Sequence, residues 1–320
     1  MKIAVLLGYG NGTFSEPILS LVDDNYINIQ CITADFNNDR ISDIAIINID
    51  YQYIRILYGN GDGTFMVETE FFLESNFEIR RMSAADVNGD GYNDIVVTST
   101  NLDGFVVCYG NADGTFVEIT TSNRQTIYIP SSINTHDFNN DNFMDIALVN
   151  DHYNTIDVFL GYGNRSFQMK KTSSIGGFLR ADYMTVGDFN EDQMLDVVVT
   201  QLEVSAVNVL FGYGDGSFGN KTKLILISDL YYSVAYLITL ADVNKDGHLD
   251  VVVCQGEPCV IIIFYGDGNG SFERHIMSSI KIFNSDSFIS TGDLNGDGYP
   301  DIISSFNNTW GVLFNNGQCS

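Results

Sequence analysis

The amino-acid sequence predicts an all-β fold, a β-propeller of four-stranded blades, and three observations support this prediction. A nine-residue acidic loop of the form Asp-x-Asn-x-Asp-x-x-x-Asp occurs six times in the same phase. Its copies start 51 residues apart, except for one step of 54 residues between Asp188 and Asp242. A glycine-rich turn that ends in Thr-Phe or Ser-Phe recurs at the same period. Repeats of this length are typical of stacked supersecondary units such as propeller blades.

Each repeat is predicted to contain four short strands. In the second repeat, residues 81–85 lead into the acidic loop and residues 94–98, rich in β-branched side chains, leave it. A third strand is expected at 105–109, and after the turn at 110–114 a fourth begins at 115–119. Short strands separated by Gly, Asn and Asp turns indicate a sandwich, barrel or propeller. No segment shows a long helical period.

The phase of the repeat at the two ends bears on the number of blades. Residues 1–7 match the third strand of a repeat, as in 207–214, so we interpret them as a strand and not as a signal peptide. This phase predicts that the chain begins within a blade and is part of a longer array. We expect a single β-propeller domain over residues 1–320 with six blades, and the alternative is seven blades of which one is incomplete.

The composition excludes two classes of partner. The formal net charge is −26 at pH 7, which argues against binding to nucleic acid or to an anionic membrane surface. No apolar segment is long enough to span a membrane, so no membrane insertion is expected in this chain.

The five cysteines do not form a disulfide framework. Cys254 and Cys259 flank a predicted strand turn, where a hairpin disulfide and two unpaired thiols are both compatible with the sequence. Cys31 and Cys108 are expected to be buried single thiols, and Cys319 lies in the tail. Glycosylation is a conditional expectation, since five Asn-x-Ser/Thr sequons occur, at Asn11, Asn164, Asn220, Asn269 and Asn307.

The acidic loops predict a metal site of oxygen ligands. Calcium takes six to eight oxygen ligands from carboxylates, amides, backbone carbonyls and water. Each loop offers side-chain oxygens at positions 1, 3, 5 and 9 and a backbone carbonyl at position 7, with no His or Cys side chain among the ligands. The alternative is that Asp and Asn only build turns, but three aspartates in one tight turn repel one another without a cation. We therefore expect up to six calcium ions.

The predicted ligands belong to the loops at 35–43, 86–94, 137–145, 188–196, 242–250 and 293–301. They are Asp35, Asn37, Asp39, Ile41, Asp43, Asp86, Asn88, Asp90, Tyr92, Asp94, Asp137, Asn139, Asp141, Phe143, Asp145, Asp188, Asn190, Asp192, Met194, Asp196, Asp242, Asn244, Asp246, His248, Asp250, Asp293, Asn295, Asp297, Tyr299 and Asp301.

Position 6 separates the six copies. A glycine stands there in the loops that start at Asp86, Asp242 and Asp293, and Arg40, Asn142 and Gln193 stand there in the others. A sharp metal loop favours a residue that tolerates positive φ, which Gly does readily and Arg and Gln do not. We expect the three glycine-containing loops to bind calcium best and the loops at Asp35 and Asp188 to bind it most weakly.

The segments 87–97 and 294–302 resemble the FG-GAP, or VCBS-type, repeats found in the N-terminal β-propeller of integrin α-subunits and in many secreted proteins. This resemblance covers essentially the whole chain. It implies a β-propeller with calcium in the hairpin that joins the first and second strands of each blade. Two departures stand out: the usual Asp at position 3 is Asn throughout, and the glycine at position 6 is missing three times.

The resemblance and the loops together predict an extracellular or cell-surface recognition or adhesion module that binds a protein or glycan and is not an enzyme. The expected ligand surface is the end of the blades opposite the acidic loops, where the segments 48–53, 100–104, 150–155 and 255–259 vary between repeats. Aromatic residues in the blade connections belong to this surface or plug between blades: Phe77, Tyr128, Phe178, Tyr231 and Tyr232.

Two other functions stay open. One is an accessory propeller domain of a secreted carbohydrate-active enzyme, and the other is a structural spacer in a repeat array. The four histidines, His136, His152, His248 and His275, are scattered, and no nucleophile or zinc motif occurs. Asp103, Asp151 and Glu203 are candidates to converge on one predicted rim, and the alternative is that they are isolated, solvated loop acids of a chain with net charge −26.

Overall fold

The computed structural model describes most of the chain. The described residues are 2–21, 29–48, 53–73, 78–99, 104–119, 130–168, 171–176, 180–201, 206–226, 235–256, 260–279, 288–306 and 309–317. Every regular element defined within them is a β-strand. The predicted fold class, an all-β β-propeller built from four-stranded blades, is confirmed.

The chain divides into two compact units. The first contains Met1–Leu7, Phe14–His152 and Asp157–Lys171, and the second contains Gly8–Thr13, Tyr153–Ile156 and Thr172–Ser320. The prediction of a single domain over the whole chain stays a prediction.

The first unit holds a short N-terminal sheet and two complete blades. The N-terminal sheet pairs β1 (Lys2–Val5) with β2 (Ile18–Leu21). The first complete blade contains β3 (Ile29–Ala34), β4 (Asp43–Asn48), β5 (Tyr53–Gly59) and β6 (Phe65–Phe72). The next contains β7 (Ile79–Ala85), β8 (Asp94–Ser99), β9 (Phe105–Gly110) and β10 (Phe116–Ile119).

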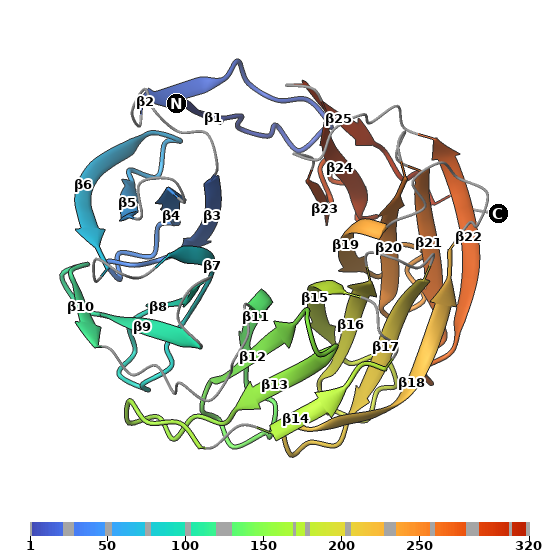
Figure 1. Cartoon of the computed structure of the whole chain (residues 1–320). Coiled ribbons are helices and arrows are strands. Elements are labelled where there is room, and N and C mark those ends of the chain that lie inside the picture. Colours follow the sequence, from blue (N-terminus) through green and yellow to red (C-terminus); the bar gives the residue numbers. More distant parts are fainter. Residues whose placement is uncertain are drawn as a thin grey trace. The chain divides into compact units, whose positions relative to one another are not determined.

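The third complete blade contains β11 (Pro130–His136), β12 (Asp145–Asn150), β13 (Thr155–Phe159) and β14 (Lys171–Ser174). In each blade the strands follow one another in sequence order, and neighbouring strands pair antiparallel. Figure 1 shows these blades as separate meanders.

The second unit continues with the same strand order. One blade contains β15 (Ala181–Gly187), β16 (Asp196–Gln201), β17 (Ala206–Gly212) and β18 (Phe218–Ile225). The next contains β19 (Ala235–Ala241), β20 (Asp250–Gln255), β21 (Val260–Gly266) and β22 (Phe272–Ser279). The last sheet has three described strands, β23 (Ile289–Gly292), β24 (Asp301–Phe306) and β25 (Thr309–Leu313).

The six expected blades are thus five four-stranded sheets and this sheet of three described strands. Residues 2–5 form a strand, as expected from the repeat phase, and they pair with β2 in a sheet of their own.

The second strand of each complete blade explains how the blades pack. β8, β12, β16 and β20 are buried along their whole length, on both faces of the sheet. A strand that is covered on both faces has a continuous run of apolar residues such as Val and Ile in its sequence, as in the Val-Val-Val run of β16. One core cluster joins Ile47 and Ile56 to Ile95 and Val97, and another joins Val198 and Val209 to Val251 and Val253. Neighbouring blades within each unit therefore share an apolar core.

In the part of the chain that the structure describes, no helix has the length and apolar character needed to cross a membrane.

Candidate metal-binding loops

The six acidic loops share one position in the fold. Each begins just after the first strand of a blade and ends at the first residue of the second strand, as between β7 and β8. Positions 4 and 6 have positive φ in every copy, between 57° and 91°. The non-glycine residues that adopt this left-handed conformation are Asn38, Arg40, Asn140, Asn142, Glu191, Gln193 and Lys245.

The side-chain oxygens of the loop hold this conformation by accepting backbone hydrogen bonds. The aspartate at position 1 accepts from the N–H of position 6 at 2.7–2.9 Å in all six loops. The asparagine at position 3 accepts from the N–H of position 5 at 2.9–3.2 Å. The aspartate at position 5 accepts from the N–H of position 7 at 2.8–3.1 Å. The loop backbone therefore wraps around its own oxygens.

The aspartate at position 9 has a different environment from the others. Its side chain is fully buried in all six loops, at Asp43, Asp94, Asp145, Asp196, Asp250 and Asp301. One carboxylate oxygen accepts from the N–H of position 2 at 2.7–3.0 Å. The other accepts from the N–H at the end of the third strand at 2.8–2.9 Å, which is a glycine in five blades and Asn315 in the last. This aspartate thus joins the acidic loop to the glycine turn.

Burial sets the protonation behaviour of this aspartate. It raises the pKa of Asp94 to about 7 and the pKa values of Asp145, Asp196 and Asp250 to about 6, because the charged form loses water. The two backbone N–H donors oppose this rise in each case, and the charges at positions 1 and 5 add to it.

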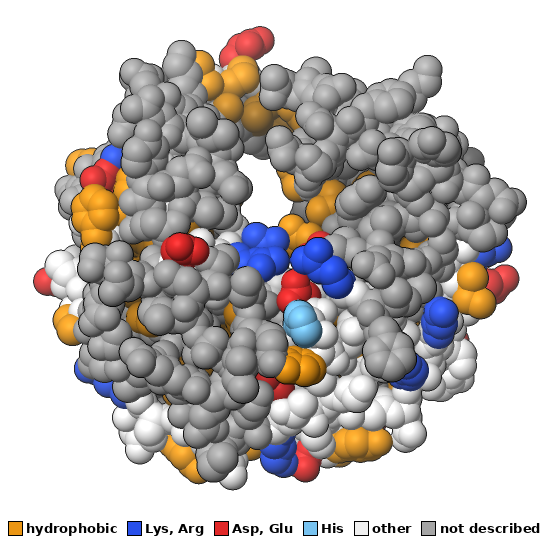
Figure 2. All heavy atoms as spheres, in the orientation of Figure 1, with side chains coloured by type: hydrophobic (Ala, Val, Ile, Leu, Met, Phe, Trp, Pro, Cys, Tyr) orange, Lys and Arg blue, Asp and Glu red, His pale blue; other side chains and the backbone are white. Residues whose placement is uncertain are grey.

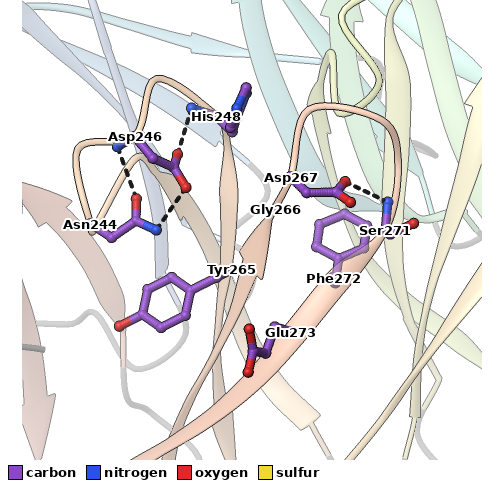
Figure 3. A pocket seen from close by; sticks show the side chains of 9 residues that line it. All are labelled: Asn244, Asp246, His248, Tyr265, Gly266, Asp267, Ser271, Phe272 and Glu273. Carbon is purple, nitrogen blue, oxygen red and sulfur yellow. Dashed lines mark hydrogen bonds between the residues drawn. The ribbon is translucent and has the colours of Figure 1, made fainter. Parts of the chain in front are cut away.

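The structure modifies the expectation that the aspartates repel one another without a cation. Backbone N–H groups partly neutralise each carboxylate, and in five loops the asparagine amide contributes as well. Its Nδ2 donates to the carboxylate of position 5 at 2.8–3.0 Å. Figure 3 shows this arrangement for Asn244 and Asp246.

The donor chemistry of the loops fits a hard cation. Every side-chain ligand predicted at positions 1, 3, 5 and 9 is an oxygen, and a carboxylate oxygen with one hydrogen bond keeps further lone-pair capacity. Among the described residues, no three or more His, Cys, Asp or Glu side chains already converge as a metal cluster. The ligand assignment at each loop therefore stays a prediction.

Position 7 links the acidic loop to the glycine turn of the same blade. Its side chain lies where the Cβ of the turn's third residue would be, as Phe143 does at Gly163, where an added Cβ would lie 2.2 Å from the ring. His248 at Gly268 and Tyr299 at Gly317 repeat the relationship, with closest approaches of 2.4 and 2.6 Å. In these three blades the acidic loop and the glycine turn therefore lie at the same end, and position 7 leaves no room for a side chain on the third residue of the turn.

Position 4 carries contacts that sequence reasoning missed. Within the second unit, Glu191 at position 4 of one loop bonds to Nδ1 of His248 at position 7 of the next at 2.5 Å, which raises the pKa of His248. Lys245 at position 4 of that loop lies with its Nζ 4.0 Å from the centre of the Tyr299 ring, at position 7 of the following loop. Both contacts join position 4 of one loop to position 7 of the next. Because these positions recur at the repeat spacing, the sequence contained the pattern that would predict the contacts.

Glycine turns also contact the acidic loop of the preceding blade. Gly270 donates from its N–H to the carbonyl of Phe189 at 3.1 Å, and Gly12 donates to the carbonyl of Leu294 at the same distance. Phe189 and Leu294 both occupy position 2 of an acidic loop. The N-terminal turn at 8–13 thus meets the last loop in the way that an internal turn meets its neighbour.

A shallow pocket of about 590 Å³ lies between an acidic loop and the glycine turn of the same blade, in the sheet β19–β22. Asn244, Asp246 and His248 line one side of it, and Asp267 and Ser271 line the other (Figure 3). Asp267 accepts a hydrogen bond from the N–H of Ser271 at 3.0 Å and so closes the turn. The pocket offers carboxylates, an imidazole and the aromatic rings of Tyr265 and Phe272.

Most of the predicted ligand surface lies outside the described residues. This holds for Phe77, Tyr128, Phe178, Tyr231 and Tyr232, for Asp103 and Glu203, and for parts of the segments 48–53, 100–104 and 255–259. The segment 150–155 is described: it is a tight turn in which Asn154 is buried and its carbonyl accepts from the N–H of Ile175 at 2.8 Å.

The cysteines and sequons give mixed outcomes. Cys254 is disulfide-bonded, and its predicted partner Cys259 lies outside the described residues, as does Cys319. Cys108 is a buried free thiol as expected, but Cys31 is exposed, contrary to expectation, because it lies on the open face of β3. The sequon residues Asn11, Asn164, Asn220 and Asn269 are exposed, and Asn307 lies outside the described residues.

In Figure 2 the visible Lys and Arg side chains are scattered among acidic and apolar ones. Three of the exposed tyrosines, Tyr9, Tyr162 and Tyr213, occupy the same second position of a glycine turn and are 51–65 % exposed.

The blades and their loops define a tandem-repeat β-propeller protein. The chain belongs to the FG-GAP-like repeat family, whose model matches residues 35–97, 86–148, 137–199, 188–253 and 242–304. Comparison with curated protein sequences gave no match.

Solved structures share the fold. One is a lectin from Agrocybe aegerita described as recognising non-reducing terminal N-acetylglucosamine: the TM-score is 0.64 at 16 % identity, over 99 % of this chain and 91 % of the lectin. Another is an inactive virginiamycin B lyase from Staphylococcus aureus with quinupristin, with a TM-score of 0.53 at 13 % identity over 89 % of this chain and 88 % of the lyase. At these identities the likeness shows the fold alone.

Proposed function

We propose that this chain is a calcium-stabilised recognition module that acts outside the cell or at its surface, binds a protein or glycan, and catalyses no reaction. One observation carries the proposal: six loops keep the same oxygen donors in the same hydrogen-bonded backbone conformation, although the residues between those donors differ. Turn formation alone does not require three carboxylates in each copy.

Calcium supplies positive charge to the oxygens at positions 1, 3 and 5, of which the aspartate at position 5 is exposed in all six loops. Hydrogen bonds from the backbone already orient these oxygens, so little ordering is needed when an ion binds. The aspartate at position 9 is buried beneath the loop. Its carboxylate accepts hydrogen bonds from the N–H of position 2 and from the N–H at the end of the third strand. Its main part is to hold the loop in place.

The ligand chemistry also favours a location with abundant calcium. Asn at position 3 removes one negative charge from each loop, which lowers affinity relative to a loop with four carboxylates. Extracellular modules bind calcium with dissociation constants of about 0.1–1 mM, and such weak sites are filled outside the cell.

A glycan is the ligand class that the comparisons support first. The lectin of similar fold, with a TM-score of 0.64, recognises a terminal sugar. Tyr9, Tyr162 and Tyr213 present exposed rings, and such rings offer an apolar face for stacking. A protein ligand, a carbohydrate-active enzyme in which this chain is an accessory domain, and a spacer role are the other outcomes of the test.

Calcium binding is tested by thermal unfolding in calcium and in EGTA. Binding to the folded state alone stabilises by RT ln(1 + [L]/Kd), about 2.7 kcal/mol for one site at a calcium concentration of 100 Kd. We expect Tm to rise with calcium and to fall on addition of EGTA, and magnesium at equal concentration serves as the control. An unchanged Tm refutes the metal assignment.

Recognition is tested on a glycan array probed with the calcium-loaded protein and with the EGTA-treated protein. Calcium-dependent binding to a defined sugar supports the proposal for a glycan. The single variants Tyr9→Ala, Tyr162→Ala and Tyr213→Ala then test whether each ring takes part in binding. Binding to neither glycans nor candidate extracellular proteins favours the spacer.

A further inference from the structure

One glycine turn departs from the other five at a single position. The fifth residue of the turn is glycine at Gly12, Gly63, Gly114, Gly216 and Gly270, all with positive φ. In the turn at 161–167 this residue is Arg165, and its φ is also positive, at 67°. Arginine adopts the left-handed conformation much less readily than glycine does. The contacts of the Arg165 side chain therefore have to explain why an arginine occupies this position.

Arg165 reaches from its own blade to the acidic loop of the preceding blade. Its guanidinium carbon lies 4.6 Å from the centre of the Tyr109 ring, and one guanidinium nitrogen lies 3.9 Å from Oδ2 of Asp90. The Tyr109 hydroxyl donates a hydrogen bond to the carbonyl oxygen of Arg165 at 3.5 Å. All three residues belong to the first unit. The ring thus holds the guanidinium beside position 5 of the loop at 86–94.

The loop at 86–94 also departs from the other five. In those, Nδ2 of the asparagine at position 3 donates to the carboxylate at position 5 at 2.8–3.0 Å. Here Nδ2 of Asn88 is buried without a hydrogen-bond partner, and only 6 % of Asn88 is exposed. Oδ2 of Asp90, the oxygen that such an amide would bind, is instead the one that lies near Arg165.

We propose that Arg165 is a built-in counter-ion for the loop at 86–94, and that it lowers the calcium affinity of this loop below that of its neighbours. The inference rests on the proposed calcium function. A calcium ion held by Asp90 would share that carboxylate with a fixed positive charge and would be repelled by it. Glycines at positions 4 and 6 make this loop one of the two with the least backbone strain, and the charge of Arg165 overrides that advantage.

The test compares wild type with Arg165→Gly, which restores the residue found in the other five turns, and with Arg165→Lys, which keeps the charge. Calcium binding is measured by isothermal titration and by equilibrium dialysis with radioactive calcium. For Arg165→Gly we expect the affinity of one site to rise about tenfold, and for Arg165→Lys we expect a smaller rise. Asp90→Asn, added to each background, identifies that site: it should remove the gain of Arg165→Gly.

Arg274→Gln is the matched control, because this substitution changes the net charge by the same amount as Arg165→Gly. Arg274 is exposed and donates a hydrogen bond to the carbonyl of Ile225. It should leave all calcium affinities unchanged. If wild type and Arg165→Gly bind calcium with the same affinities and number of ions, the counter-ion role is wrong while the calcium function stands. If neither protein binds calcium, the proposed function itself is wrong, and this inference falls with it.

Discussion

The carboxylate of Asp94 accepts a hydrogen bond from the backbone N–H of Gly110 at 2.9 Å, sixteen residues further along the chain. Its other oxygen accepts from the N–H of Val87, also at 2.9 Å. Asp94 is fully buried and starts β8, while Gly110 ends β9 and Val87 follows β7. One side chain therefore joins three strands of a blade at the end that carries the acidic loop. The same pair of bonds recurs in the other five loops, with Asn315 in place of the glycine in the last.

Asp94→Asn should destabilise the protein even without calcium. The amide keeps the size of the side chain but has a single acceptor oxygen, so its NH₂ group faces a backbone donor and one buried N–H loses its partner. We expect a loss of about 1–3 kcal/mol in the free energy of unfolding, measured by urea unfolding in EGTA. Asp90→Asn is the control, because Asp90 is partly exposed. Equal losses for the two variants would contradict a structural role for position 9.

The stability of the calcium-free protein should fall as pH rises towards 8. The pKa of Asp94 is raised to about 7 in the folded state, above its ordinary value of 3.8, so the folded protein binds this proton more tightly than the unfolded chain does. The resulting stabilisation is complete below the unfolded pKa and is lost as pH rises through the folded pKa. Asp145, Asp196 and Asp250 act in the same direction at about pH 6.

Urea unfolding in EGTA and high salt, at several pH values between about 5 and 8, measures this effect. High salt screens the repulsion between surface charges, which also grows with pH, and leaves the buried carboxylates largely unaffected. Equal stability across this range, or higher stability at the alkaline end, would show that these aspartates are ionised throughout.

The repeat phase explains how much of this structure the sequence predicts. Asp94 and Gly110 each recur at a fixed place in the repeat, so the strands on either side of them follow from the spacing alone. The positive φ of Glu191 and Lys245 does not follow from their identity. It accompanies hydrogen bonds that the N–H groups of the next residues donate to the aspartate at position 1 of each loop. The approach of Arg165 to Asp90 depends on how one blade faces the next, which no local pattern encodes.

Gln193→Gly should stabilise the loop at 188–196. Gln193 has a φ of 66°, a conformation that costs a residue with a side chain roughly 1 kcal/mol and costs glycine almost nothing. We expect a gain of about 0.5–1 kcal/mol in EGTA, where calcium does not contribute. Lys223→Gly is the control, because Lys223 is an exposed residue within β18 and glycine in a strand interior is destabilising. A loss of stability at both positions would mean that the contacts of the Gln193 side chain outweigh its backbone strain.

Tyr58→Phe should weaken the contact between two neighbouring blades of the first unit. The Tyr58 hydroxyl, at the end of β5, donates to the carbonyl of Gly114 at 2.7 Å in the glycine turn of the next blade, and Tyr58 is 6 % exposed. Removing the hydroxyl leaves that carbonyl without this donor, at an expected cost of about 1 kcal/mol in the free energy of unfolding. Tyr162→Phe is the matched control, because Tyr162 is 51 % exposed.

Gly114→Ala tests the same contact from the other side. Gly114 has a φ of 78°, and an added Cβ would lie 2.5 Å from the Tyr58 hydroxyl oxygen. We expect Gly114→Ala to cost about 1–3 kcal/mol, since it combines backbone strain with this clash. In the double variant with Tyr58→Phe the clash is smaller, so the two losses should add to more than the loss of the double variant. Strict additivity would show that Tyr58 and Gly114 stabilise their blades independently.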